Sequence, residues 1–247
     1  MKQSIHCSGA NKATGGEYED IHCSGSLKIQ GSTSCRTLQN SGAFKLDGNL
    51  DCSGELHSSG AAKIAGSVRT GSARISGSLK CEGDVHCAEG FRCSGSTELD
   101  GNLQIGSGSF SGICSVSGTL HGGELRVSGK LTAQEVEAER FTADGKLEIS
   151  GLLNAENIEI GVSNVNEVGD IGGGTISVRY VPHGFGFRER VLRTKSIEGD
   201  TVSLECTQAE VVRGKNVRIG RGCKIGRVEY SGDLTVEGGE VGEQMRL

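Results

Sequence analysis

The sequence predicts an all-β protein, a right-handed three-sided parallel β-helix (β-solenoid) with about 17–18 residues per coil. Two patterns carry this prediction: glycines return at a fixed period, and apolar residues alternate with polar ones between them. The composition agrees, with 41 glycines, one proline and 4% aromatic residues in 247 residues. A core with so few large side chains must be thin, as it is in repeat proteins.

One seven-residue phrase shows the period. It is GSLKIQG at 25–31, GAFKLDG at 42–48, GAAKIAG at 60–66 and GSLKCEG at 77–83. In each copy two apolar residues flank a lysine, so the apolar pair points inward and the lysine outward. We expect three such strands per coil, with glycines at the corners where the chain turns sharply. Equivalent strands then stack in parallel about 4.8 Å apart, and such connections are predominantly right-handed.

The regularity divides the chain into three segments. Residues 1–161 fit about eight to nine coils, and the coils resume over 197–247. Between them, 162–196 contains a GGG run, the only proline and a GFGF stretch, which predict an insertion in the form of a loop or β-hairpin flap. The insertion offers a possible partner contact, although a surface loop without a partner is as reasonable. Its candidate contact residues are Phe185, Phe187, Arg188 and Arg190.

Inward apolar positions continue to both ends of the sequence. Ile5 and Cys7 occupy them at the start, and Leu234, Val236 and Val241 occupy them near the end. An uncovered strand edge is a template for pairing with another chain. We therefore expect these five residues to form an end-to-end polymerisation interface. The alternative is that residues 1–3, or the insertion, cover an end.

The repeated seven-residue segments resemble the coils of a known family. The segments GSLKIQG, GAFKLDG, GNLDCSG (48–54) and GKLEISG (145–151) are similar to the coils of bactofilins, which are polymer-forming bacterial cytoskeletal proteins. The resemblance implies filaments that assemble without nucleotide and localise other proteins in cell shape, polarity or motility. It implies partners such as the protein itself, a paralogous bactofilin, a membrane surface or membrane-associated proteins. The chain departs from the family in its insertion, its many cysteines and its lack of proline-rich tails.

The lysines of the repeated phrase form a candidate lateral surface. Lys28, Lys45, Lys63 and Lys80 would stack on one face and could contact an anionic surface, although corner carboxylates such as Asp47, Glu82 and Asp84 offset them. The alternative is a solvated face on which lysine opposes lateral aggregation of strands. Nucleic acid is not an expected partner, because the isoelectric point is near 5.7 and aromatic residues are scarce.

The ten cysteines are expected to be thiols. Neither an apolar leader nor a membrane-spanning run is visible, so we expect a cytoplasmic protein, with association with a membrane surface left open. Most cysteines fall on inward positions, where they act as small apolar residues. Stacked pairs such as Cys35 and Cys52 leave a bridge geometrically conceivable. His6 and His22 adjoin cysteines, but adjacent strand residues point to opposite faces, so a catalytic dyad is not expected.

An enzyme is the alternative function. The stretch VRIGRGCKIG (217–226) resembles the repeat of hexapeptide-repeat acyltransferases, which wind as left-handed β-helices. Elsewhere glycine follows the inward residue by two positions, and the stretch holds no histidine to serve as the base. We therefore expect no catalytic residue, no metal and no cofactor.

Overall fold

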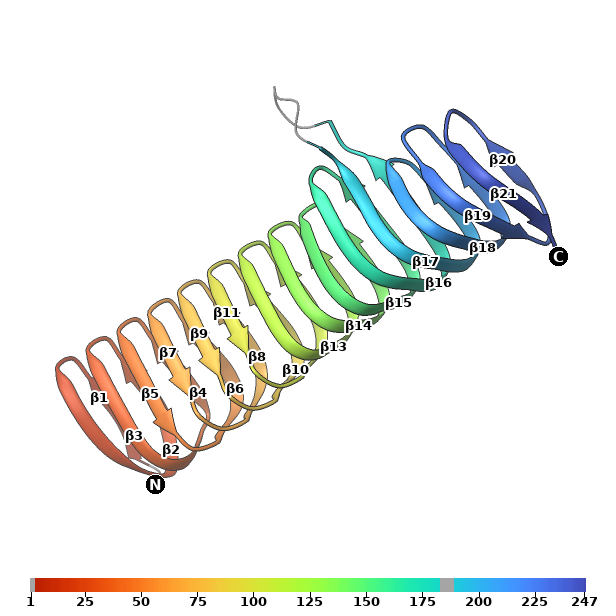
Figure 1. The fold of residues 1–247 in the computed structure, drawn as a ribbon. Coiled ribbons are helices and arrows are strands. Elements are labelled where there is room, and N and C mark those ends of the chain that lie inside the picture. The colour runs from red at the N-terminus through yellow and green to blue at the C-terminus, as the bar shows by residue number, and fades with distance from the viewer. Residues whose placement is uncertain (1–2, 183–188) are drawn as a thin grey trace. The chain divides into compact units, whose positions relative to one another are not determined.

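The computed structural model describes residues 3–182 and 189–247. The described chain is all-β and forms a parallel β-solenoid of about 14 turns (Figure 1). This confirms the fold class that the glycine period predicts. The right-handed sense of the coil stays a prediction. No helix of the described residues is long and apolar enough to cross a membrane.

The chain divides into two compact units, Met1–Gly123 and Glu124–Leu247. The strands of the first unit are β1 Gln3–Cys7, β2 Ala10–Cys23, β3 Ser26–Cys35, β4 Thr37–Asn40, β5 Ala43–Asp47, β6 Leu50–Ser58, β7 Ala61–Ile64, β8 Val68–Ile75, β9 Ser78–Cys81, β10 Val85–Cys93, β11 Ser96–Leu99 and β12 Leu103–Phe110. The strand β13, Ile113–Val127, runs through the boundary. The strands of the second unit are β14 Lys130–Ala143, β15 Lys146–Val162, β16 Val165–Tyr180, β17 Val191–Leu204, β18 Thr207–Ile219, β19 Lys224–Tyr230, β20 Leu234–Val236 and β21 Glu240–Arg246.

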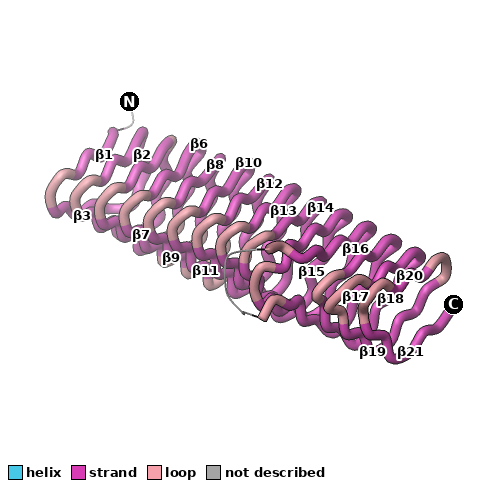
Figure 2. The backbone as a smooth tube through the Cα atoms, turned by 90° about the horizontal axis from the view of Figure 1, so that it is seen from above, coloured by secondary structure: helices cyan, strands magenta, loops and turns pink. Residues whose placement is uncertain are grey.

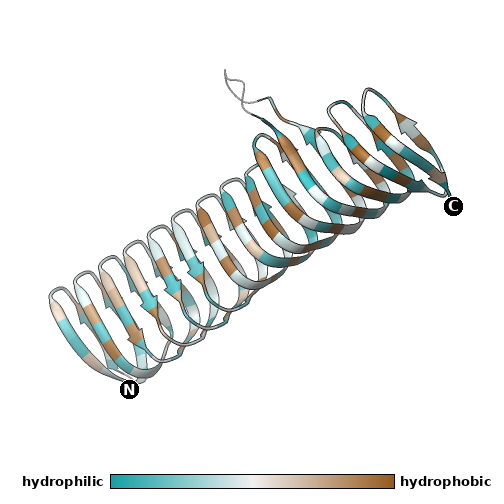
Figure 3. Cartoon of the chain, viewed as in Figure 1, coloured by the Kyte–Doolittle hydropathy of each residue, from teal (hydrophilic) through white to brown (hydrophobic). Residues whose placement is uncertain are grey.

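Equivalent residues of successive turns are direct neighbours in the parallel ladder. On the face that carries the repeated phrase, Leu27 pairs with Phe44, and Phe44 pairs with Ala62. The lysines between them pair in the same order, Lys28 with Lys45 and then Lys63. Each position of the repeat therefore becomes a column of side chains along the stack. Apolar and polar positions alternate along each strand, as the hydropathy colouring shows (Figure 3).

The core of an interior turn of the first unit consists of three inward pairs, one from each straight segment. One such turn starts at Ala73 in β8 and continues through β9 into β10. Its inward pairs are Ala73/Ile75, Leu79/Cys81 and Val85/Cys87, all of them buried. Volume is balanced between neighbouring turns. Phe91 has the small Ala73 and Gly108 as its register partners in the adjacent turns. The side chains of Phe110 and Ile105 lie where a Cβ on Gly108 would stand, so large side chains fill the space that small ones leave.

One column of glycines forms a corner that admits no side chain. A Cβ added to Gly42 would lie 1.9 Å from the carbonyl oxygen of Gly25, and one added to Gly60 would lie 2.0 Å from that of Gly42. The loops at this corner follow one another along the first unit (Figure 2). Close approach of backbone to backbone, rather than a positive φ, therefore fixes glycine here.

The predicted insertion over 162–196 is wrong in its extent. Residues 165–180 form β16, which pairs in parallel with β15 and with β17. The glycines of the GGG run belong to this ladder: a Cβ on Gly173 would lie 2.2 Å from the carbonyl oxygen of Ala155. The run is thus another place of close backbone approach. Of the described residues between β16 and β17, Val181, Pro182, Glu189 and Arg190 are outside any strand.

Candidate functional site: the two terminal turns

The first turn presents an open strand edge. β1 pairs with β2 along one side, through Ile5–Ile21 and Cys7–Cys23, and in the described part of the chain no strand covers its other side. Cys7 is buried, with 3% of its surface exposed, and Ile5 is half-buried. The predicted interface residues of this end therefore do lie on the outermost strand.

The last turn presents a second open edge with apolar side chains on it. β20 pairs only with β18, and β21 only with β19, among the residues that the structure describes. Leu234 and Val241 are half-buried and Val236 is 39% exposed, so the predicted residues of this end also lie on the outermost strands. Met245 and Leu247, which the sequence interpretation missed, are 45% and 72% exposed.

The lysine column is a ladder of ion pairs. Lys28 and Lys45 share Asp47, with Nζ–carboxylate distances of 3.0 and 3.3 Å, and Lys63 lies 2.9 Å from Glu82. Lys80 bonds the carboxylate of Glu98 on the next turn. These lysines hold the pKa values of Asp47 and Glu82 below the ordinary range. An anionic surface would have to displace these carboxylates, so lateral binding there stays a prediction that the geometry does not favour.

A separate group of ion pairs in the second unit gives a pH prediction. Lys130 and Lys146 bond Glu148 from both sides, both at 2.6 Å, and lower the pKa of its carboxyl from 4.5 to about 2. A depressed carboxyl pKa contributes stability above pH 4.5, which is lost as the pH falls through about 2. We expect Glu148→Gln to reduce the loss of stability between pH 5 and pH 2, modestly because the pair is partly exposed (roughly 1 kcal/mol or less). Urea unfolding at several pH values measures this, and an identical pH dependence in both proteins would contradict it.

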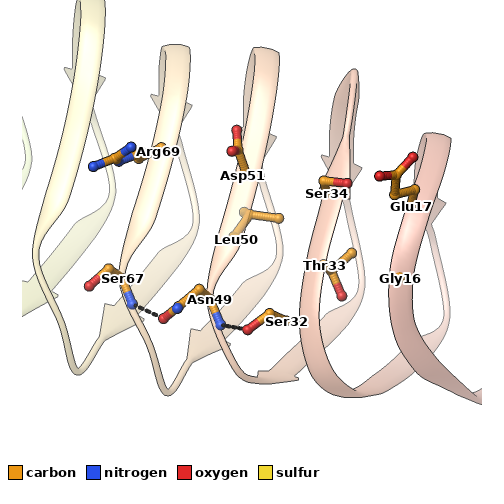
Figure 4. Close-up of a pocket in the computed structure, with 10 residues that line it drawn as sticks. All are labelled: Gly16, Glu17, Ser32, Thr33, Ser34, Asn49, Leu50, Asp51, Ser67 and Arg69. Atoms are coloured by element: carbon orange, nitrogen blue, oxygen red, sulfur yellow. Dashed lines mark hydrogen bonds between the residues drawn. The ribbon is translucent and has the colours of Figure 1, made fainter.

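A polar pocket lies on another face of the first unit (Figure 4). It has a volume of about 580 Å³ and includes Asp51 and Arg69, which are neighbours across β6 and β8. An overlapping pocket of about 730 Å³ shares both residues and extends to His86. In the first of these pockets, Asn49 Oδ1 accepts the backbone N–H of Ser67 at 3.0 Å. The pocket offers a carboxylate and a guanidinium, with no feature that selects one ligand class.

The cysteines occupy the core. All ten are thiols, and all except the half-buried Cys206 are buried. Cys35 and Cys52 are direct neighbours across β3 and β6. Their mutual hydrogen bond, together with burial, raises the pKa of Cys35. The described residues contain no group of three or more Cys, His, Asp or Glu side chains that could hold a metal ion. The cysteines therefore pack as small apolar residues.

Most of the candidate contact residues of the insertion fall outside the described residues, namely Phe185, Phe187 and Arg188. Arg190 is described. Its Nη1 donates to the hydroxyl of Tyr180 at 2.6 Å, and its guanidinium lies 5.5 Å from the centre of that ring. Arg190 thus links the residue before β17 to Tyr180 at the end of β16.

Comparison with known proteins gives two relatives. The chain is 48% identical over 81 residues to the uncharacterized protein YhbF of Bacillus subtilis (strain 168), covering 32% of this chain and 34% of YhbF. It is 39% identical over 100 residues to the uncharacterized protein YhbE of the same organism, covering 36% of this chain and 40% of YhbE. The chain thus matches less than half the length of each of these relatives. No protein-family model and no solved structure matches it.

Proposed function

We propose that the protein is a structural cytoskeletal scaffold that assembles end to end into filaments without nucleotide. The observation that carries the proposal is the pair of terminal turns. There β1, β20 and β21 carry half-buried or exposed apolar side chains and have no strand on their outer edge among the described residues. The resemblance of the coils to those of bactofilins supports it. In this proposal Ile5, Cys7, Leu234, Val236 and Val241 form the interface.

The physical basis is edge pairing combined with burial of apolar surface. An open edge offers a row of backbone donors and acceptors to another strand. The exposed Val236, Met245 and Leu247 concentrate apolar surface at one end of the chain. Covering such side chains is favourable by about 25 cal/mol for each Å² of apolar surface removed from water. A second copy of the chain supplies strands and apolar side chains of the same kind.

The scaffold role follows from assembly. A filament of identical subunits repeats every surface site at a fixed interval, which suits it to localise other proteins in cell shape, polarity or motility. We propose a cytoplasmic location, with a paralogous bactofilin, a membrane surface or membrane-associated proteins as partners. Neither nucleic acid nor a catalytic residue has a part in this function.

Electron microscopy and sedimentation of the purified protein test the proposal. We expect filaments of uniform width that form at neutral pH without ATP or GTP and that persist after nucleotide-depleting treatment. The competing function is a hexapeptide-repeat acyltransferase. Discrete trimers that bind an acyl-coenzyme A donor would replace the scaffold with that enzyme, and a monomer at all concentrations would remove self-assembly.

A further inference from the structure

Two cysteines of adjacent turns lie side by side inside the first unit. Cys35 ends β3 and is the register partner of Cys52 on β6, in a parallel pairing. Adjacent parallel strands lie about 4.8 Å apart, and the Cα atoms of a disulfide lie about 4.4–6.8 Å apart. The two thiols therefore stand where a bridge can form, and only a small approach of the two Cβ atoms is needed.

The two thiols of this pair are not equivalent. The thiol of Cys35 donates to the sulfur of Cys52, and the hydroxyl of Thr70 and the backbone N–H groups of Gly54 and Leu38 also favour the Cys52 thiolate. These donors lower the pKa of Cys52 to about 7, whereas the same hydrogen bond raises the pKa of Cys35. Because the thiolate is the nucleophile, Cys52 is the thiol that attacks an oxidant, and Cys35 is the thiol that resolves the product.

Two comparisons within the first unit set this pair apart. Cys7 and Cys23 are also in register, at the first turn, but burial raises the pKa of Cys23. Cys81 has Ile64 and Leu99 as its register partners, so no second thiol lies beside it along the ladder. Burial raises the pKa of Cys81 as well. Cys81 is therefore an internal reference for a buried thiol with no thiol partner in register.

The surface beside the pair is open to a small oxidant. Cys35 and Cys52 are buried, with 5% and 1% of their surfaces exposed. The pocket of about 580 Å³ is lined by the residues that directly precede them, Ser34 and Asp51, together with Leu50 (Figure 4). A hydroperoxide in this pocket needs only a local opening of β3 or β6 to reach the sulfur atoms.

We propose that Cys35 and Cys52 form a modification site, a thiol pair that a hydroperoxide oxidises to a reversible bridge between adjacent turns. With hydrogen peroxide, the Cys52 thiolate attacks one oxygen, the O–O bond breaks, and a sulfenic acid and hydroxide form. The hydroxide takes up the proton that Cys52 released. The thiol of Cys35 then attacks the sulfenic sulfur, the S–S bond forms, the S–O bond breaks, and water leaves with the thiol proton.

The balance of this reaction is complete. The two thiols lose two electrons, and hydrogen peroxide is reduced to two molecules of water. The proposal goes beyond the scaffold function and holds whether or not copies of the chain assemble. A failed bridge would leave filament formation untouched, and absent filaments would leave the bridge untouched.

Peptide mapping of the full-length reduced protein after exposure to hydrogen peroxide tests the proposal. Trypsin cleaves after Arg36 and Lys45, which lie between the two cysteines, so a bridge is what keeps their fragments joined. We expect joined fragments that dithiothreitol separates, while Cys81 stays a thiol. Free thiols at both Cys35 and Cys52 would overturn the proposal. Oxidation of Cys81 at the same rate would also overturn it, because general unfolding would then be exposing the thiols.

Two variants separate the roles of the thiols. Cys35→Ser keeps a hydroxyl donor beside Cys52 but cannot resolve the sulfenic acid, so we expect dimedone to trap that acid at Cys52. In Cys52→Ser we expect Cys35 to remain a thiol over the same time, because it lacks thiolate character. Equally fast trapping at Cys35 would contradict these roles. Cys81→Ser is the matched control for the loss of a buried thiol and should form the bridge at the wild-type rate.

The stability of the folded chain gives a second readout. A bridge between residues 35 and 52 closes a loop in the unfolded chain, so we expect the oxidised wild-type protein to unfold at a higher urea concentration than the reduced protein. Cys35→Ser should show the same urea midpoint before and after the peroxide treatment. A midpoint that stays the same or falls in the bridged wild type would contradict a bridge that fits the folded turns.

Discussion

Phe91→Ala is expected to destabilise the folded chain by about 3–5 kcal/mol, the largest loss of stability from a single core truncation that we predict. Phe91 is fully buried, and its ring centroid lies 6.0 Å from that of Phe110 at a tilt of 35°. Its neighbours in the column are Ala73 and Gly108. Ala73 is too short to fill the cavity, and the buried Phe110 beside it can relax only in part, so we expect a cost within the usual range for truncating a buried phenylalanine.

Arg92→Ala is the matched control. Arg92 follows Phe91 on β10 but is exposed on the outer face, so we expect a change within about 0.5 kcal/mol. The free energy of unfolding in urea, measured at one protein concentration for all three proteins, gives both numbers. Equal stabilities of Phe91→Ala and Arg92→Ala would contradict the packing described for this turn.

The alternation of residue types was sufficient to predict the core. Leu27 and Ile29 point inward because strand side chains alternate, and their partners Phe44 and Leu46 repeat the pattern one turn later. The same rule placed the cysteines in the core. It failed at the GGG run, because three glycines signal a break in most contexts. Here they mark close approach between turns, which only the register of β15, β16 and β17 reveals.

The candidate site was predictable in position but not in its electrostatics. Lys28 and Asp47 are 19 residues apart and meet only because the turns stack. Of the three corner carboxylates expected to offset the lysines, Asp47 and Glu82 do so, whereas Asp84 accepts the backbone N–H of Asn102.

Val236→Lys is expected to have the largest effect on assembly. In the folded chain Val236 is 39% exposed at the open edge of β20, so a lysine there leaves the ammonium in water and the fold intact. In an end-to-end junction the same position becomes covered by another turn. An ammonium covered without a partner costs at least about 2 kcal/mol, which raises the critical concentration roughly thirtyfold or more.

Thr235→Lys is the matched control for Val236→Lys. It adds the same charge to β20, but at a position that the end-to-end junction does not cover. Thr235 lies next to Val236 on the same strand but on its outward side, where its register partner is the exposed Arg218. A lysine there stays in water whether or not a second copy is present, so we expect filaments close to those of the wild type. Far-UV circular dichroism should show the same β-signal for both variants. Sedimentation should show long filaments for Thr235→Lys and free protomers for Val236→Lys. Equal sedimentation of the two would mean that the inward side of β20 is not covered in the filament, and the end-to-end junction would then have to be abandoned.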